Sequence, residues 1–293
     1  APPPLNSAER IVAAARAAGL SKIDYLVISH YHVDHVGGVE DLLKAFPVGT
    51  VIDHGPNREM PPEGANAAML RFATSTLYPA YLKAIEGHEH RVMKAGDTLA
   101  IDGLDLTAVV SDRKVIEAPA GAATNDACAT ATSKAQDGGE ENARSLGFLM
   151  HWGKARLLAA ADTSWNVENE LACPQNRIAP VDLYIADNHA SDISNSPAFV
   201  NSIAPRVVLF QNGPRKGADA SVFETVRAAP RHEALWQMHT AERAAGHNEP
   251  PQRIANLTGG TDGHPLSVYV ARDGAITIVN PRIGHSETYP AGK

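Results

Sequence analysis

Short apolar runs alternate with amphipathic, alanine-rich stretches along the chain, and this alternation predicts a mixed α/β fold. A first helix is expected to begin after Asn6, which has capping-box spacing to Glu9, and to end at Gly19. The apolar run at residues 23–29 follows directly and predicts a strand buried on both faces. A helix that leads into such a strand is the repeating unit of α/β proteins.

The same two patterns recur through the rest of the chain. The helical segment 65–86 is expected to break at Pro79, and residues 117–143, which lack periodicity, are expected to form a long surface loop. No repeat or linker is evident, so residues 1–293 are interpreted as a single domain. The remaining predictions are strands at 49–55, 181–187 and 205–212, an antiparallel meander at 90–111, hairpins at 145–162 (turning at Gly153-Lys154) and 266–280 (turning at Asp273-Gly274), and helices at 40–46, 218–229 and from about Pro197.

Three histidines and an aspartate follow the first predicted strand within six positions: His30, His32, Asp34 and His35. Ligands in α/β proteins bind beyond the carboxyl ends of strands, where these residues lie. His30 and His32 are two residues apart and point the same way in an extended chain, whereas Asp34 and His35 come after a bend. Imidazole and carboxylate groups are ligands for zinc, manganese and iron, so the spacing predicts a metal site.

Composition narrows the class of protein. The chain has 293 residues, 20% of them charged, and a formal net charge of −7. An acidic chain gives no strong signal for nucleic-acid binding. No segment approaches the roughly 20 apolar residues that a membrane-spanning helix needs.

The segment SHYHVDHVGG resembles the metal-binding motif of the metallo-β-lactamase superfamily, and the resemblance extends over about residues 20–215. It implies an αββα sandwich of two mixed sheets flanked by helices, with the opening strands of the family apparently missing. Asp162 matches the family's bridging aspartate and His189 its late histidine. The resemblance therefore implies two divalent metals, with zinc expected and manganese or iron as alternatives. One would be held by His30 and His32, and the other by Asp34, His35 and His189.

The later segments resemble an exported bacterial branch related to the hydrolase domain of competence proteins, but with departures. Asn188 stands where relatives often have a histidine, which raises the question of reduced activity. No histidine is evident as the third ligand of the first metal, and Asn142 is a candidate weak ligand there. His54 ends a strand on the same side and is a candidate substrate contact. Asp187 is a candidate to orient His189.

The resemblance implies a hydrolase that uses a metal-activated water, with Asp34 and Asp162 as catalytic residues. The expected substrate is a small phosphodiester or related ester, and the loop with Arg215 and Lys216 is a candidate clamp for its anionic group. A non-catalytic metal-binding domain, or a weakly active family member, is the alternative. Di-iron redox chemistry would need extra carboxylate ligands, and no acidic residue near residues 80–100 matches them.

The two cysteines, Cys128 and Cys173, lack the spacing of a zinc knuckle. They are either two separate thiols or one disulfide, and the resemblance to an exported branch makes the disulfide as strong an expectation as the separate thiols. It also implies a periplasmic or secreted location, although the chain shows no signal peptide. The oligomeric state is left open.

Overall fold

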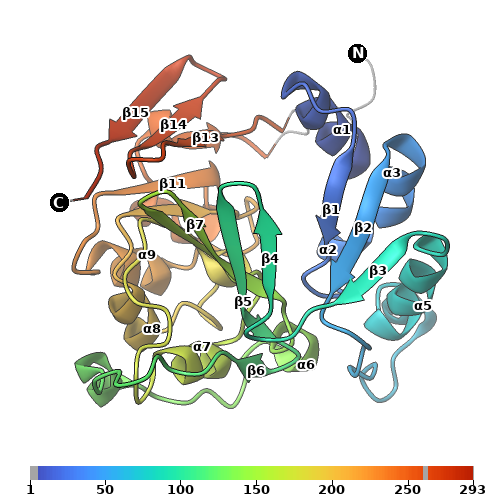
Figure 1. Cartoon of the computed structure of the whole chain (residues 1–293), viewed down its shortest axis with the longest axis horizontal. Helices are drawn as coiled ribbons and strands as arrows, with labels where there is room; N and C mark the ends of the chain where they lie inside the picture. The colour runs from blue at the N-terminus through green and yellow to red at the C-terminus, as the bar shows by residue number, and fades with distance from the viewer. Residues whose placement is uncertain (1–5, 260–262, 293) are drawn as a thin grey trace.

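The computed structural model describes residues 6–259 and 263–292. Two sheets pack against each other in the middle of the molecule, and helices cover their outer faces (Figure 1). This is the mixed α/β arrangement that the sequence predicts. The buried side chains between the sheets include Ile52 and Met93 from one sheet and Leu106 and Phe148 from the other.

The N-terminal sheet has three strands, all parallel, in the order β1-β2-β3. The buried faces of α1 and α3 pack together against β1, and α5 adds Tyr81 to a second cluster with Tyr31 and Val51. The elements of this part are α1 (Ser7–Ala17), β1 (Ile23–Val27), α2 (Val33–Val36), α3 (Val39–Ala45), β2 (Val48–Asp53), α4 (Ala67–Leu70), α5 (Thr74–Ala84) and β3 (Glu89–Val92).

The large sheet has nine strands and is mixed: it is antiparallel from β4 to β8 and parallel from β8 to β12. Its order is β12-β11-β10-β9-β8-β7-β5-β4, with β6 paired to β5. The strands are β4 (Thr98–Ile101), β5 (Leu104–Ser111), β6 (Lys114–Val115), β7 (Gly147–Trp152), β8 (Ala155–Ala159), β9 (Leu183–Ile185), β10 (Val207–Phe210), β11 (Ala234–His239) and β12 (Ile254–Asn256).

Helices and a third sheet cover the large sheet. Three helices bury Leu171, Phe199 and Phe223 in its main core, and a C-terminal antiparallel sheet packs Ile276 and Ile278 against Trp236 in a separate cluster. The elements are η1 (Asp126–Thr130), α6 (Gly139–Asn142), α7 (Trp165–Ala172), η2 (Asp187–Ala190), α8 (Pro197–Ile203), α9 (Ala220–Arg227), η3 (Glu242–His247), η4 (Pro251–Arg253), β13 (Ser267–Val270), β14 (Ile276–Asn280) and β15 (His285–Tyr289).

Several local predictions are confirmed. The Asn6 side chain accepts a hydrogen bond from the Glu9 backbone N–H at 2.9 Å, and Glu9 accepts one from the Asn6 N–H at 2.7 Å, which completes the capping box. Both hairpins have their turns at the predicted places. The helix predicted from Pro197 begins there, with Ser196 as its N-cap.

Four predictions about local structure are wrong. β1 is an edge strand with Asp24 and Tyr25 exposed, so it is not buried on both faces. β3 leaves the predicted meander and pairs in parallel with β2. The helical segment breaks at residues 71–73, and α5 continues through Pro79 because only the bond to the Ser75 carbonyl is lost there. The loop 117–143 carries η1 and α6 and buries two of its polar residues.

Cys128 and Cys173 form a disulfide with their Cα atoms 5.7 Å apart, which confirms the pairing. It joins η1 to the end of α7, where the Asn125 side chain also donates to the Ala172 carbonyl at 2.8 Å. The long loop is thus fastened to the helical face of the large sheet. None of the helices in the described ranges is both long enough and apolar enough to span a bilayer.

Removing the disulfide by Cys128→Ser/Cys173→Ser is expected to lower the free energy of unfolding by about 3–4 kcal/mol, the chain-entropy value for a loop of this length. The two cysteines lie 45 positions apart, and the chain has no other cysteine, so reductant acts on this bond alone. Urea unfolding of the oxidised protein, the reduced protein and the variant measures the difference. Equal urea midpoints for the three samples would contradict the prediction.

Candidate metal centre

The predicted ligands come from the carboxyl ends of three strands. His30 and His32 follow β1, and α2 then carries Asp34 and His35. Asp162 follows β8, and His189 lies in η2, directly after β9. Because β8 and β9 are parallel neighbours, the two strands deliver Asp162 and His189 to the same edge of the large sheet.

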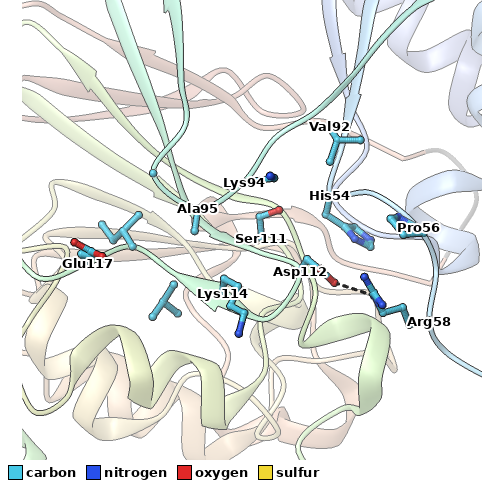
Figure 2. A pocket seen from close by; sticks show the side chains of 13 residues that line it. His54, Pro56, Arg58, Val92, Lys94, Ala95, Ser111, Asp112, Lys114 and Glu117 are labelled. Atoms are coloured by element: carbon cyan, nitrogen blue, oxygen red, sulfur yellow. Dashed lines mark ion pairs between the residues drawn. The ribbon is translucent and has the colours of Figure 1, made fainter.

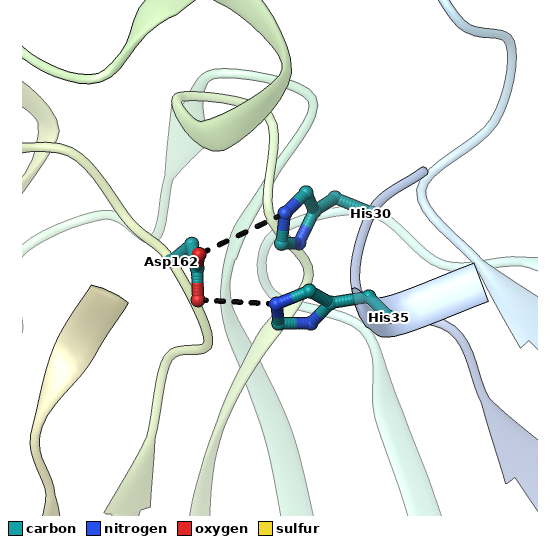
Figure 3. Close-up of side chains that lie close together, drawn as sticks. All are labelled: His30, His35 and Asp162. Carbon is teal, nitrogen blue, oxygen red and sulfur yellow. Dashed lines mark ion pairs between the residues drawn. The ribbon is translucent and has the colours of Figure 1, made fainter. Parts of the chain in front are cut away.

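Asp162 lies opposite the motif histidines, and Figure 3 shows its carboxylate facing the rings of His30 and His35. Asp162 Oδ2 is 4.0 Å from His30 Nε2, and Oδ1 is 3.4 Å from His35 Nε2. His30 Nε2 is also 3.1 Å from Nδ1 of His32. Four side chains with nitrogen or oxygen donors thus converge from two distant parts of the chain.

Asp34 gathers a second group of donors. Its Oδ2 atom is 3.0 Å from His189 Nε2 and 3.5 Å from His35 Nε2. His189 Nε2 is in turn 3.5 Å from Asp162 Oδ2. The ligand atoms of His30, His35 and Asp162, and likewise those of Asp34, His35 and His189, all lie within 4.8 Å of one another. Asp162 and His35 therefore stand between two adjacent groups.

The donors fit a cation. His35 Nε2 and His189 Nε2 are buried and have no hydrogen-bond partner in the described chain, although each faces two carboxylates. A ring nitrogen and carboxylate oxygens aimed at one point, without hydrogen-bond geometry between them, suit a metal ion that accepts all their lone pairs. The centre is thus chemically suited to divalent metal.

The protein field keeps both carboxylates ionised. Burial would raise the pKa of Asp162 and of Asp34, but the facing rings of His189 and His35 outweigh burial and hold both values far below the ordinary range. Burial likewise lowers the pKa of His189, yet the two carboxylates overcome it and raise the value to about 9. Burial dominates at His30, whose pKa is well below its usual value, so this ring is neutral as a ligand must be.

Two further contacts orient the rings. Ser29 Oγ lies 3.2 Å from His30 Nδ1 and 3.1 Å from His35 Nδ1, so one hydroxyl positions both histidines. His189 Nδ1 donates to the Gln211 carbonyl at 3.0 Å. The prediction that Asp187 orients His189 is therefore wrong, because the backbone of the neighbouring strand end performs this role.

Asp187 belongs instead to a buried carboxyl pair. Burial, and then repulsion from Glu168, raise the pKa of Asp187 well above its usual range. Glu168 accepts backbone hydrogen bonds from Asn195 at 2.6 Å and Ser196 at 2.7 Å, yet burial still raises its pKa. The two carboxyl groups therefore retain a proton beneath the loop that carries His189.

The weaker candidates lie at the margin of the centre. Asn142 Oδ1 and Asn188 Nδ2 are buried and unpartnered in the described structure, and both amides border Gly138. His54 is buried, with Nε2 3.0 Å from Glu141 Oε1. Their roles as weak ligand or substrate contact stay predictions.

Sequence reasoning missed Glu59 and Glu141. Glu59 Oε2 is 3.3 Å from Nε2 of His32, and Glu141 accepts the Tyr31 backbone N–H at 2.8 Å. Glu59 follows no strand directly, so no pattern marks it. Glu141 lies in a segment that was interpreted as a surface loop. Its position directly before Asn142, a candidate ligand, was the one feature of the sequence that could have indicated a role at the centre.

Comparison with known proteins gives a family match. The family model described as the metallo-beta-lactamase superfamily matches residues 4–174. The hydroxyacylglutathione hydrolase of Alkalilimnicola ehrlichii is 47% identical over 57 residues, which span 20% of this chain and only 21% of that hydrolase.

Two solved structures resemble this chain over most of its length. Igni18, a metallo hydrolase from Ignicoccus hospitalis, is 14% identical with a TM-score of 0.41, over 73% of this chain and 75% of its own. YhfI from Bacillus subtilis, a metallo-beta-lactamase fold protein, is 11% identical with a TM-score of 0.41, over 79% and 82%.

The grouping of the donors predicts the metal content of the protein. Purified protein is expected to hold about one to two equivalents of transition metal, and His35→Ala should lose at least half of it, because His35 belongs to both donor groups. His151→Ala is the matched control, since His151 is exposed on β7. Elemental analysis of the folded variants gives the answer, and equal metal in His35→Ala and wild type would refute the assignment.

The second prediction concerns the carboxyl pair. In the pH range between the unfolded and folded pKa of Asp187, the folded state holds a proton that the unfolded chain has released, so stability falls as pH rises above about 4. Asp187→Asn replaces the carboxyl group with an amide that cannot ionise. The variant should therefore lose this pH dependence of the free energy of unfolding, which amounts to at most about 1.4 kcal/mol per pH unit. Urea unfolding of both proteins across pH, with chelator present, measures this slope. An unchanged slope in the variant would contradict it.

Proposed function

Because the chain belongs to the metallo-β-lactamase superfamily, we propose that it is a metal-dependent hydrolase acting on a small-molecule ester at a binuclear centre. The observation that carries the proposal is the position of Asp162. Its carboxylate reaches donors of both proposed sets: Oδ2 lies 4.0 Å from His30 Nε2 and 3.5 Å from His189 Nε2, and Oδ1 lies 3.4 Å from His35 Nε2. One carboxylate between two groups of donors is the arrangement that a pair of metal ions requires.

The donors divide into two sets under this proposal. His30 and His32, with Asn142 as the candidate additional ligand, would hold one ion; Asp34, His35 and His189 would hold the other, and Asp162 would bridge. Zinc suits these imidazole and carboxylate groups best, with manganese or iron as alternatives. When bound, such a pair lowers the pKa of water and polarises the oxygen of the ester.

The chain's own residues would orient the attacking water and neutralise the negative charge of the substrate. Asp34 would orient the attacking water by accepting a hydrogen bond from it, since its carboxylate stays ionised. Lys216 contacts Asp34 through its ammonium group and brings a positive charge to the centre. Arg215 pairs with Glu242 at 2.7 Å, whereas Lys216 pairs with a predicted metal ligand, so Lys216 is the loop cation that lies at the centre.

A small phosphodiester or related anionic ester is the proposed substrate. Lys216 supports it, because a phosphodiester needs its charge neutralised as well as its bond attacked. A thioester is the second candidate, favoured by the partial identity to a hydroxyacylglutathione hydrolase. The disulfide supports an oxidising compartment, and we include a periplasmic or secreted location in the proposal.

Kinetics on a substrate panel test the proposal. We expect bis(4-nitrophenyl) phosphate to be hydrolysed with a higher kcat/KM than a chromogenic cephalosporin, and Asp162→Asn to lower that value by about 10²–10³-fold through loss of a fixed charge at the reacting group. His151→Ala should keep wild-type kinetics.

Other outcomes are equally informative. A higher kcat/KM for the cephalosporin would show that the substrate class is wrong, and a preference for the hydroxyacylglutathione thioester would favour the second candidate. Full metal content without turnover of any ester would leave a non-catalytic metal-binding domain.

A further inference from the structure

A cavity of about 780 Å³ lies beside the metal centre, a size typical of small-molecule sites. Figure 2 shows its lining side chains converging from both sheets. The N-terminal sheet contributes residues after β2 and β3, and the large sheet contributes the β5–β6 turn. Since β1 and β2 are parallel neighbours, this cavity opens at the same sheet edge as the histidine motif.

The cavity is positively charged although the chain is acidic. Arg58, Lys94 and Lys114 line it, against Asp112 and Glu117. Asp112 is already shared between two guanidinium groups, those of Arg58 at 3.6 Å and of Arg144. Neither Lys94 nor Lys114 has an ion-pair partner among the described residues, so their charge is available to an anion.

Two short connections join the cavity to the metal-binding loop. His54 forms part of the cavity wall, and its Nε2 lies 3.0 Å from the Glu141 oxygen that accepts the Tyr31 N–H, between His30 and His32. Arg58 lines the cavity while the next residue, Glu59, lies 3.3 Å from His32. Consecutive Cα atoms are about 3.8 Å apart, so the cavity and the centre are adjacent.

The wall also contains an unsatisfied polar atom. Nδ1 of His54 is buried and has no hydrogen-bond partner within the described part of the chain. Buried polar atoms normally have a partner, and a bound group can supply one. The polar and cationic lining therefore suits a carboxylate or a phosphate.

We infer that this cavity binds an anionic group of the substrate, a carboxylate or phosphate separate from the ester that is cleaved; this assignment rests on the proposed hydrolase function. Lys94 and Lys114 hold the group by charge, and Arg58 adds a fork of N–H donors. The enzyme then selects acidic esters over neutral ones of the same reactivity.

The test compares two esters with one leaving group, neutral 4-nitrophenyl acetate and the acidic mono-4-nitrophenyl ester of succinic acid. Metal-loaded wild type is expected to prefer the acidic ester in kcat/KM by about tenfold or more, the value of one charge-assisted hydrogen bond. Lys94→Gln/Lys114→Gln should lose that preference and keep its rate on the acetate. Lys83→Gln/Lys154→Gln removes the same charge elsewhere and should behave as wild type.

A binding measurement separates this inference from the proposed function. Calorimetry with succinate and with inorganic phosphate is expected to show binding to wild type, to the Lys83/Lys154 control and to Asp162→Asn, but at least tenfold weaker binding to the cavity variant. Such binding without turnover of either ester or of bis(4-nitrophenyl) phosphate would remove the hydrolase proposal and leave the anion site standing. Equal affinity of the cavity variant and its control would overturn the site. Cavity-dependent phosphate binding without preference for the acidic ester would overturn the assignment to the substrate and identify a site for free anions.

Discussion

The centre depends on one buried carboxylate, that of Glu141. This side chain is fully buried, and one oxygen accepts both the Tyr31 N–H at 2.8 Å and the His54 ring at 3.0 Å. The first contact fixes the backbone between His30 and His32, and the second fixes the end of β2. Glu141 itself comes from α6, which precedes β7 of the large sheet. Because one Glu141 oxygen accepts hydrogen bonds from the chain after β1 and from the chain after β2, this side chain joins the large sheet to the N-terminal sheet at the edge where the predicted ligands lie.

Much of this arrangement could be predicted from local pattern. The H-x-H-x-D-H spacing after a strand, and the strand ends before Asp162 and His189, were sufficient to bring these residues together. The edge position of β1 and the transfer of β3 to the N-terminal sheet were not predictable, because sheet order depends on contacts between distant segments. The contacts of Glu59 and Glu141 at the centre could not be predicted for the same reason. Each residue contacts a partner that is distant in sequence, and neither belongs to a periodic pattern.

The turn that carries His189 has an unusual backbone. Asn188, His189 and Ala190 all have positive φ, at 47°, 57° and 62°, and such residues cost about 1–3 kcal/mol each. The surrounding chain enforces the turn through backbone bonds from Asn188 N–H to Ala161 and from Ala218 N–H to His189, at 2.8 and 2.9 Å. A Cβ on Gly217 would come within 1.9 Å of the His189 carbonyl, so only glycine allows this close approach. Strain held by packing at one ligand is typical of a preorganised site.

The disulfide has a consequence for metal selectivity. Both cysteines of the chain are joined in it, so the protein offers no thiolate to a metal. Donors at the centre are then limited to imidazole, carboxylate and amide groups, which discriminate against soft cations such as Cu(I). The bond between Cys128 and Cys173 therefore removes both thiols of the chain from the ligands open to a metal, in addition to fastening the long loop.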